Sequence, residues 1–296
     1  MKTEKNILVA FILNLAFSIF EFIGGAFINS VAIVSDAIHD IGDSLSIGIS
    51  YFLEKKSKRK PDSKYTYGYV RYSVIGSLIT TAILLVGSIL VVYNAIKRII
   101  DPVEINYNGM IIFAIIGVVV NFGAAYFTRE GDSLNQKSVN LHMLEDVLGW
   151  VVVLIGAIIM RFTDISIIDP ILSIFVALFI FINAIRNLKE IIDLFLEKTP
   201  NSIDIDEIKE HLLKIKNVID VHHIHVWSID GYSNYATMHV VCDKSDKKVK
   251  HEIREELEEH GISHVTIELE EKGEECDNCE CEVKTSKHTH HHHHHH

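Results

Sequence analysis

The sequence predicts an α-helical membrane domain with six transmembrane helices, followed by a smaller C-terminal α+β domain. Apolar residues make up 48% of the chain and gather in long blocks that end near Glu190, beyond which the chain is highly charged. Apolar blocks of about 20 residues cross a bilayer, and charged segments do not. This split predicts a membrane domain over residues 1–198, an α+β domain over 199–272 and a cysteine-containing tail over 273–289. Residues 290–296 are all histidine and are typical of a purification tag.

Six segments are predicted to cross the membrane. They are residues 7–28, 36–53, 72–99, 108–128, 139–162 and 168–192. A hydrocarbon core of roughly 30 Å requires about 20 residues of helix. The second segment is short and polar for a span. It is included because its neighbours require an even count and its polar residues recur on one helical face.

Lysine and arginine predict the orientation. The stretch from Lys55 to Arg71 carries seven basic residues, and Lys2 and Lys5 lie near the N-terminus. Both regions fall on one side of a six-helix protein, which the positive-inside rule places in the cytoplasm. We therefore expect a multi-pass protein of the cell (inner) membrane with both termini cytoplasmic. The basic stretch is explained by topology, and the net charge is −11, so no nucleic-acid partner is expected.

Beyond Pro200 the pattern changes to short amphipathic elements. Residues 204–215 have apolar residues at helical spacing, 218–229 and 235–242 alternate like strands, 247–260 fit a helix, and 265–269 fit a last strand. The order αββαβ predicts a small layer with helices on one face of a sheet.

Two apolar segments carry the same histidine–aspartate spacing. His39 precedes Asp43 by four residues, and His142 precedes Asp146 by four. Residues four apart share one helical face, so each segment offers an imidazole and a carboxylate pointing the same way. Charged groups are costly inside a bilayer and rarely lie there without a role. Two facing pairs supply the four N/O ligands of a tetrahedral zinc site. Such a site also suits cobalt or cadmium, whereas an all-carboxylate site favours manganese or magnesium.

A metal must displace protons from His39 and His142 before it binds, so metal and proton compete for one site. This competition is the simplest basis for antiport. Glu21 is a further carboxylate in an apolar segment, and we expect it to serve the ion pathway or its proton balance. Asn14 lies on the same helical face and fits either the pathway or helix packing.

No motif for energy coupling or catalysis is present. The sequence has neither a phosphate-binding GxxxxGK[ST] loop nor an HExxH zinc-protease motif. We therefore expect gradient-driven transport and no enzymatic activity.

The charged domain is rich in histidine. Its candidate ligands are His222, His223, His225, His239, His251, His264 and Glu268. The strand period of two predicts that His223 and His225 share one face and that His222 points to the other. The tail carries Cys276, Cys279 and Cys281, which form either a soft-metal chelator of reduced thiols or an ordinary tail.

From about Asn6 to Glu270 the chain resembles the cation diffusion facilitators, in particular their zinc-transporting bacterial branch. The resemblance rests on four stretches: NSVAIVSDAIH at 29–39, YGYVRY at 67–72, NLHMLED at 140–146 and VHHIHVW at 221–227.

The resemblance implies exchange of cytosolic zinc for outside protons by a homodimer with a ferredoxin-like cytosolic domain. The intramembrane site would be His39, Asp43, His142 and Asp146. A Zn²⁺ site in the cytosolic domain, at the dimer interface, would use His222, His239 and Glu268, with His251 nearby. Two alternatives stay open: an exporter with manganese, iron or cobalt as main substrate, and a membrane metal sensor without net flux.

Overall fold

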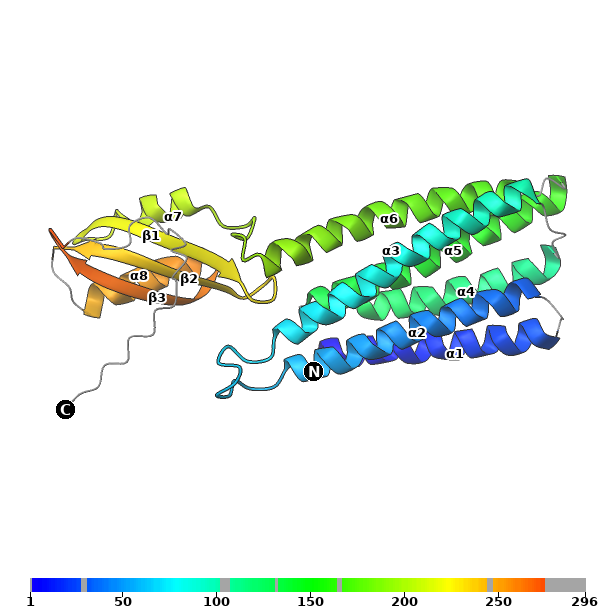
Figure 1. Cartoon of the computed structure of the whole chain (residues 1–296), viewed down its shortest axis with the longest axis horizontal. Helices are drawn as coiled ribbons and strands as arrows, with labels where there is room; N and C mark the ends of the chain where they lie inside the picture. The colour runs from blue at the N-terminus through cyan, green and yellow to red at the C-terminus, as the bar shows by residue number, and fades with distance from the viewer. Residues whose placement is uncertain are drawn as a thin grey trace, which may run out of the picture. The chain divides into compact units, whose positions relative to one another are not determined.

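A computed structural model describes residues 2–27, 31–101, 107–130, 133–163, 167–243 and 247–274. The chain divides into two compact units (Figure 1): Met1–Glu197 with Ile229–Tyr232, and Lys198–Ser228 with Ser233–His296. The helices of the first unit are α1 (Lys2–Phe27), α2 (Val31–Ser57), α3 (Arg71–Ile100), α4 (Tyr107–Thr128), α5 (Leu134–Thr163) and α6 (Ile168–Phe195). The second unit holds α7 (Ile205–Leu212), β1 (Val218–Ser228), β2 (Asn234–Cys242), α8 (Lys247–Glu259) and β3 (Ile262–Glu271).

All six predicted long helices form. Within the described residues, four stretches are long and apolar enough to cross a membrane: Lys5–Gly24, Arg71–Ile100, Ile111–Thr128 and Leu134–Thr163. The helix α2 is longer than predicted and much more polar than α4, since it carries Asp36, Asp40 and Asp43. A count of six membrane spans therefore stays a prediction.

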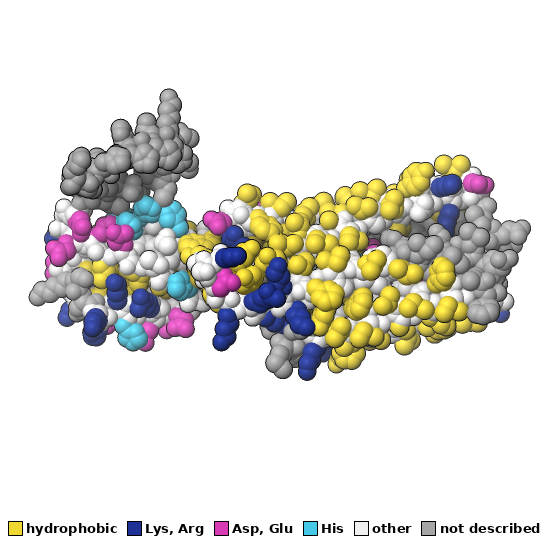
Figure 2. All heavy atoms as spheres, turned by 60° about the horizontal axis from the view of Figure 1, so that its bottom comes forward, with side chains coloured by type: hydrophobic (Ala, Val, Ile, Leu, Met, Phe, Trp, Pro, Cys, Tyr) yellow, Lys and Arg dark blue, Asp and Glu magenta, His cyan; other side chains and the backbone are white. Residues whose placement is uncertain are grey.

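The helical unit turns its apolar side chains outward. Hydrophobic side chains cover the length of its surface in Figure 2, and Phe52, Phe162 and Phe175 are largely exposed. A water-soluble bundle buries such groups, whereas a lipid environment accommodates them. Close helix approach occurs where a side chain is missing: a Cβ on Gly117 of α4 would lie 2.4 Å from the Trp150 ring of α5.

Polar side chains lie inside this unit and link its helices. Thr80 Oγ1 of α3 and Ser50 Oγ of α2 are 2.7 Å apart. Asn187 of α6 donates hydrogen bonds to Thr81 and Ser138, at 2.7 and 2.8 Å. Thr80 and Thr81 of α3 therefore make hydrogen bonds to neighbouring helices in addition to packing against them. Polar pairs of this kind stabilise helix association where water is absent.

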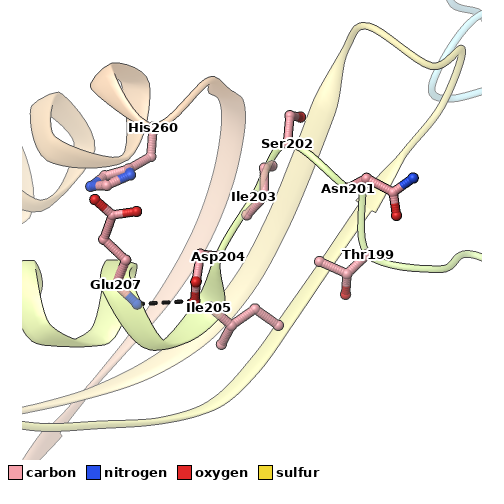
Figure 3. A pocket seen from close by; sticks show the side chains of 8 residues that line it. All are labelled: Thr199, Asn201, Ser202, Ile203, Asp204, Ile205, Glu207 and His260. Atoms are coloured by element: carbon pink, nitrogen blue, oxygen red, sulfur yellow. Dashed lines mark hydrogen bonds between the residues drawn. The ribbon is translucent and has the colours of Figure 1, made fainter.

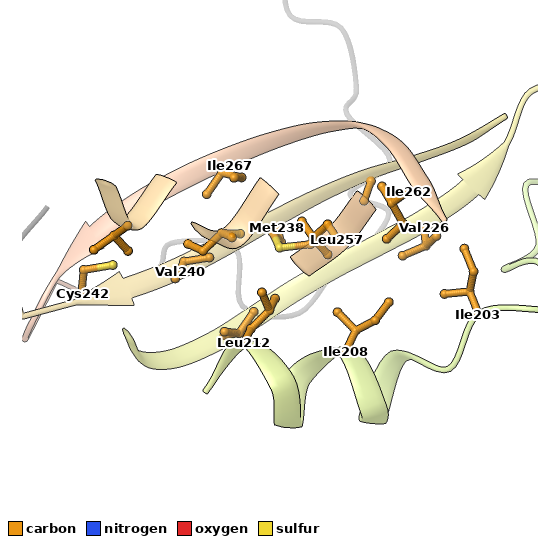
Figure 4. Packing of buried hydrophobic residues seen from close by; sticks show 14 residues of the cluster. Ile203, Ile208, Leu212, Val226, Met238, Val240, Cys242, Leu257, Ile262 and Ile267 are labelled. Atoms are coloured by element: carbon orange, nitrogen blue, oxygen red, sulfur yellow. The ribbon is translucent and has the colours of Figure 1, made fainter. Parts of the chain in front are cut away.

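The second unit is a three-stranded sheet with two helices packed on one face. β2 is central, antiparallel to β1 and parallel to β3. Ile208 and Leu212 of α7 and Ile253 and Leu257 of α8 are fully buried against apolar residues of the strands (Figure 4). Met238 belongs to this core, so the residues that alternate with the core positions of β2, His239 among them, lie on the opposite face of the sheet. The predicted αββαβ order is confirmed.

One detail of β1 differs from the prediction. The pairing of β1 with β2 shifts register between His222 and His225, and His223 has a φ of 53°. A bulge with one residue in the left-handed region interrupts the alternation of faces. The ring of His223 therefore stacks on that of His239, 4.7 Å away, and His222 lies on the same side, 5.5 Å from His239. The prediction that His222 and His223 point to opposite faces is wrong for this reason.

Candidate metal sites

Three of the four residues predicted for the membrane site lie together. One ligand atom each from Asp43, His142 and Asp146 falls within 4.8 Å of the others. Asp43 comes from α2, and the other two come from consecutive turns of α5. His142 is 3% exposed and Asp43 is 6% exposed, so the group is shielded from bulk solvent. Because His142 and Asp146 are four residues apart on α5, their side chains lie on one face of that helix, the face toward α2.

The imidazole of His142 is placed to bind a cation. Among the side chains that the structure describes, neither of its ring nitrogens makes a hydrogen bond. Nε2 lies 3.7 Å from Asp43 Oδ2, and Nδ1 lies 3.9 Å from Glu145 Oε2. Buried polar atoms normally have a hydrogen-bond partner, and an exception calls for an explanation. A metal ion between His142 and its carboxylates would supply one.

The remaining residues predicted for the membrane unit are placed as follows. His39 lies on α2 one turn before Asp43, and its side chain lies outside the described residues. Glu21 and Asn14 are both buried in α1, at 0% and 2% exposure. Neither belongs to the cluster of Asp43, His142 and Asp146. Glu145 was not predicted to have a role, although its place beside His142 in the NLHMLED stretch marked it as a neighbour of the site.

A second cluster lies on the face of the sheet opposite the helices. His222, His239 and Glu270 each offer a ligand atom within 4.8 Å of the others. Glu270 Oε1 lies 2.6 Å from His239 Nδ1, and Oε2 lies 3.2 Å from His222 Nε2. His222 and His239 are direct partners across β1 and β2, which brings their rings together. The carboxylate of Glu270 therefore bridges the two imidazoles.

Asp220 orients one of these imidazoles. Its Oδ2 lies 3.2 Å from His222 Nδ1, and a carboxylate only accepts, so a proton on Nδ1 would be donated to Asp220 and would leave Nε2 facing Glu270. Partial burial opposes the charge of Asp220. The Val221 N–H, the charge of Lys209 and the hydrogen bond with His222 outweigh that effect and hold the pKa of the carboxyl below its ordinary value. A carboxylate behind a histidine is the common support of a metal-binding imidazole.

The structure places the other predicted cytosolic ligands apart from this core. Glu268 pairs with His239 in the sheet, its Oε2 3.3 Å from His239 Nε2, but its side chain is 70% exposed. His251 lies on α8, 71% exposed, with Glu255 3.4 Å away. Glu270 was not predicted as a ligand. The signal available in the sequence was its position two residues after Glu268 on the same strand. Cys276, Cys279 and Cys281 lie outside the described residues.

These features together define a class: a multi-pass membrane protein with a histidine–carboxylate cluster between its helices, joined to a small α+β domain that carries a second such cluster. Comparison with known families gives the same result. Residues 7–196 match the cation efflux transmembrane domain, and residues 200–272 match the cytoplasmic domain of cation efflux proteins. The chain belongs to this family, the cation diffusion facilitators. The family consists of transporters.

Similar proteins cover nearly the whole chain. The "Cadmium, cobalt and zinc/H(+)-K(+) antiporter" of Bacillus subtilis is 32% identical over 96% of this chain and 94% of its own length. The "Zinc transporter ZitB" of Yersinia pseudotuberculosis is 34% identical over 90% and 88%. The "Metal cation efflux system protein CzcD" of Cupriavidus metallidurans is 30% identical over 90% and 86%.

Proposed function

We propose that this protein is a divalent metal cation/proton antiporter that exports zinc from the cytosol. The observation that carries the proposal is the cluster of Asp43, His142 and Asp146 inside the helical unit, in which Asp43 and His142 are buried and Asp146 is partly buried. An imidazole with two carboxylates suits zinc, and we take His39, which precedes Asp43 by one turn of α2, as the fourth ligand of the proposal. The transported metal is thus held by two ligands from each of two helices.

The same ligands provide the proton coupling. An imidazole binds either a proton or a metal through a given nitrogen, so zinc arrival expels protons and proton arrival releases zinc. Glu145 lies 3.9 Å from His142 Nδ1 and is a suitable acceptor for a displaced proton. Glu21 and Asn14 are buried on the neighbouring α1, where they serve proton transfer or the pathway.

Zinc is the proposed main substrate, with cadmium and cobalt as further substrates. The names of the relatives include all three metals, and a site with imidazole ligands accommodates each of them. An exporter of manganese or iron would need a site richer in carboxylates. A sensor without net flux would bind the metal at the same residues but would not move it along a gradient.

The cytosolic unit is proposed to bind Zn²⁺ and to join two copies of the chain. His222 and His239 are the central ligands, with Glu270 beside the predicted Glu268. His251 lies on the far side of this domain and would need a second copy to reach such a site. The tail cysteines would be accessory chelators. The basic stretch after α2 supports an inner-membrane protein with both termini in the cytoplasm.

Initial transport rates across a metal panel test this function. Vesicles containing the purified protein and an acidic lumen are mixed with Zn²⁺, Cd²⁺, Co²⁺, Mn²⁺ or Fe²⁺, and lumenal metal is measured. The proposal expects uptake of zinc, cadmium and cobalt that stops when an ionophore removes the pH gradient. Uptake of manganese or iron that is faster than uptake of zinc would favour an exporter with one of those metals as its main substrate. Zinc binding without uptake would favour the sensor.

A further inference from the structure

A third histidine–carboxylate cluster lies on the helical side of the cytosolic unit, away from the cluster of His222, His239 and Glu270. It consists of His211 at the end of α7, Glu256 near the end of α8, and His260 just beyond α8. All three are partly buried, with side-chain exposures of 35%, 28% and 17%. They are therefore accessible to an ion and also packed against one another.

The three donor atoms form a compact triangle. His211 Nδ1 lies 2.8 Å from Glu256 Oε1 and 3.0 Å from His260 Nε2, and the third side, from His260 Nε2 to Glu256 Oε1, is 3.5 Å. Ligands about 2.0–2.1 Å from a tetrahedral zinc ion stand about 3.3 Å from one another. A point about 2 Å from all three atoms lies roughly 1 Å outside their plane. The triangle thus has the size of one face of a zinc tetrahedron.

Hydrogen bonding uses this triangle only in part, because a single proton on His211 Nδ1 would be shared between two acceptors. The Nδ1 atom of His211 holds either a proton or a lone pair, but it faces both a carboxylate oxygen and a second imidazole nitrogen. If it donates to Glu256, it cannot accept from His260. If it accepts from His260, a lone pair faces the carboxylate at 2.8 Å. One cation shared by the three atoms removes this conflict, because each atom then offers it a lone pair.

A pocket borders His260, one of the three residues of the site. The pocket has a volume of about 430 Å³ and is lined also by Asn201, Asp204 and Glu207. Figure 3 shows the carboxylate of Glu207 pointing toward the side of the His260 ring. Glu207 and His211 are four residues apart on α7, which places them on one face of that helix. Glu207, or water from the pocket, is therefore available as the fourth ligand.

We propose that His211, Glu256 and His260 form a separate zinc-binding site that fastens α7 to the end of α8. Two imidazole nitrogens and one carboxylate select a borderline divalent metal such as Zn²⁺ over Ca²⁺ or Mg²⁺. α7 has only eight residues, so a metal tie to α8 adds substantially to its few packing contacts. Zinc in the cytosol would then stabilise the first helix of this unit. The site does not depend on transport by the membrane unit.

Residue-resolved chemical modification tests the site in the whole chain. Diethylpyrocarbonate reacts with an imidazole nitrogen that has a free lone pair, and a histidine bound to zinc through one nitrogen carries a proton on the other. At free zinc ten times the dissociation constant, about a tenth of sites stay open, so modification of His211 and His260 should slow about tenfold relative to chelator. His264, an exposed histidine of β3 beside Tyr235, serves as the internal control and should keep its rate.

Two variants separate this site from general effects. In His260→Gln, zinc should no longer protect His211, while the rate in chelator shows whether the fold is kept. Glu270→Gln alters the separate cluster of His222, His239 and Glu270. In this variant zinc should still protect His211 from modification. Equal modification of His211 and His260 in zinc and in chelator would overturn the proposal. So would full protection of His211 in His260→Gln. Because no flux is measured, a failed transport assay leaves this result untouched.

Discussion

His142 and Asp43 face each other between α5 and α2, with the imidazole Nε2 3.7 Å from the carboxylate Oδ2. The distance exceeds that of a hydrogen bond, and both groups are almost fully buried. A metal ion between them, as proposed, would account for both facts. The relationship ties the two halves of the proposed site together and leads to the predictions below.

The preference for zinc over manganese should depend on the imidazole of His142. In His142→Asp the site gains a carboxylate and loses a nitrogen ligand, so the ratio of zinc to manganese transport should fall. Initial rates of both metals in vesicles measure the ratio. The matched control is His142→Gln, which removes the ligand without adding a carboxylate and should lose transport of both metals. A ratio in His142→Asp equal to that of the unaltered chain would show that this imidazole does not select zinc.

In the cytosolic unit, Glu270 should matter more than Glu268. Glu270 contacts both His222 and His239 and is buried, whereas Glu268 contacts only His239 and is exposed. Glu270→Gln should therefore weaken zinc binding by more than the roughly 10–100-fold typical of supporting groups, and Glu268→Gln by less. Competition with a chelator, on protein lacking the seven terminal histidines, measures both affinities. The reverse order would assign the ligand role to Glu268.

Glu54 should be a stability determinant of the helical unit. Its Oε2 accepts hydrogen bonds from Ser73 at 2.8 Å and Ser133 at 3.2 Å, and the side chain is 3% exposed. Glu54→Ala leaves these buried donors without their acceptor, which should cost about 1–3 kcal/mol and lower the thermal midpoint in detergent. The control is Glu197→Ala, which breaks an exposed pair with Arg71 and should change stability by less than about 1 kcal/mol. Similar midpoints for the two variants would refute the role of Glu54.

The loop between α2 and α3 should lose order in acid. Asp62 accepts a hydrogen bond from the Tyr69 hydroxyl at 2.6 Å and from the backbone N–H groups of Tyr65 and Lys64, and these bonds lower the pKa of its carboxyl. A group with a lowered folded-state pKa stabilises the loop above its ordinary pKa, and this contribution is lost as pH falls through the lowered value. Hydrogen exchange of residues 62–69, corrected for intrinsic rates, should show protection at neutral pH that disappears only in strong acid.

Tyr69→Phe provides the comparison for that titration. It removes the largest cause of the lowered pKa, so protection should disappear at a higher pH than in the unaltered chain. Identical pH profiles would mean that the tyrosine hydroxyl does not stabilise the charged carboxylate.

Regular patterns in the sequence predicted much of this protein. Hydrophobic blocks located five of the six long helices, and alternation located the strands, because both depend on local periodicity. The second helix was located by the even count of spans and by the polar residues on one of its faces. The four-residue spacing of His142 and Asp146 predicted that both would point the same way, and they meet Asp43 as expected. The bulge at His223 was not predicted, since a left-handed residue other than glycine has no clear sequence signal.

The cluster of His211, Glu256 and His260 could not be predicted from the periodicity of the sequence. Glu256 and His260 share a helical spacing, but His211 lies 45 residues before Glu256 and meets it only when α7 packs beside α8. Likewise, the choice between Glu268 and Glu270 depends on side-chain placement in the sheet, since both lie on the same face of β3. Such contacts follow from tertiary packing, which one sequence does not specify by local pattern.

Simultaneous recording of zinc and pH inside vesicles tests the central claim most directly. For the unaltered chain with an acidic lumen, each rise in lumenal zinc should be accompanied by loss of lumenal protons. Both signals should vanish in Asp43→Asn and persist in Asp40→Asn, which alters an acid of α2 outside the cluster. Zinc entry without any pH change, or equal zinc entry with Asp43→Asn, would contradict zinc/proton exchange at this site.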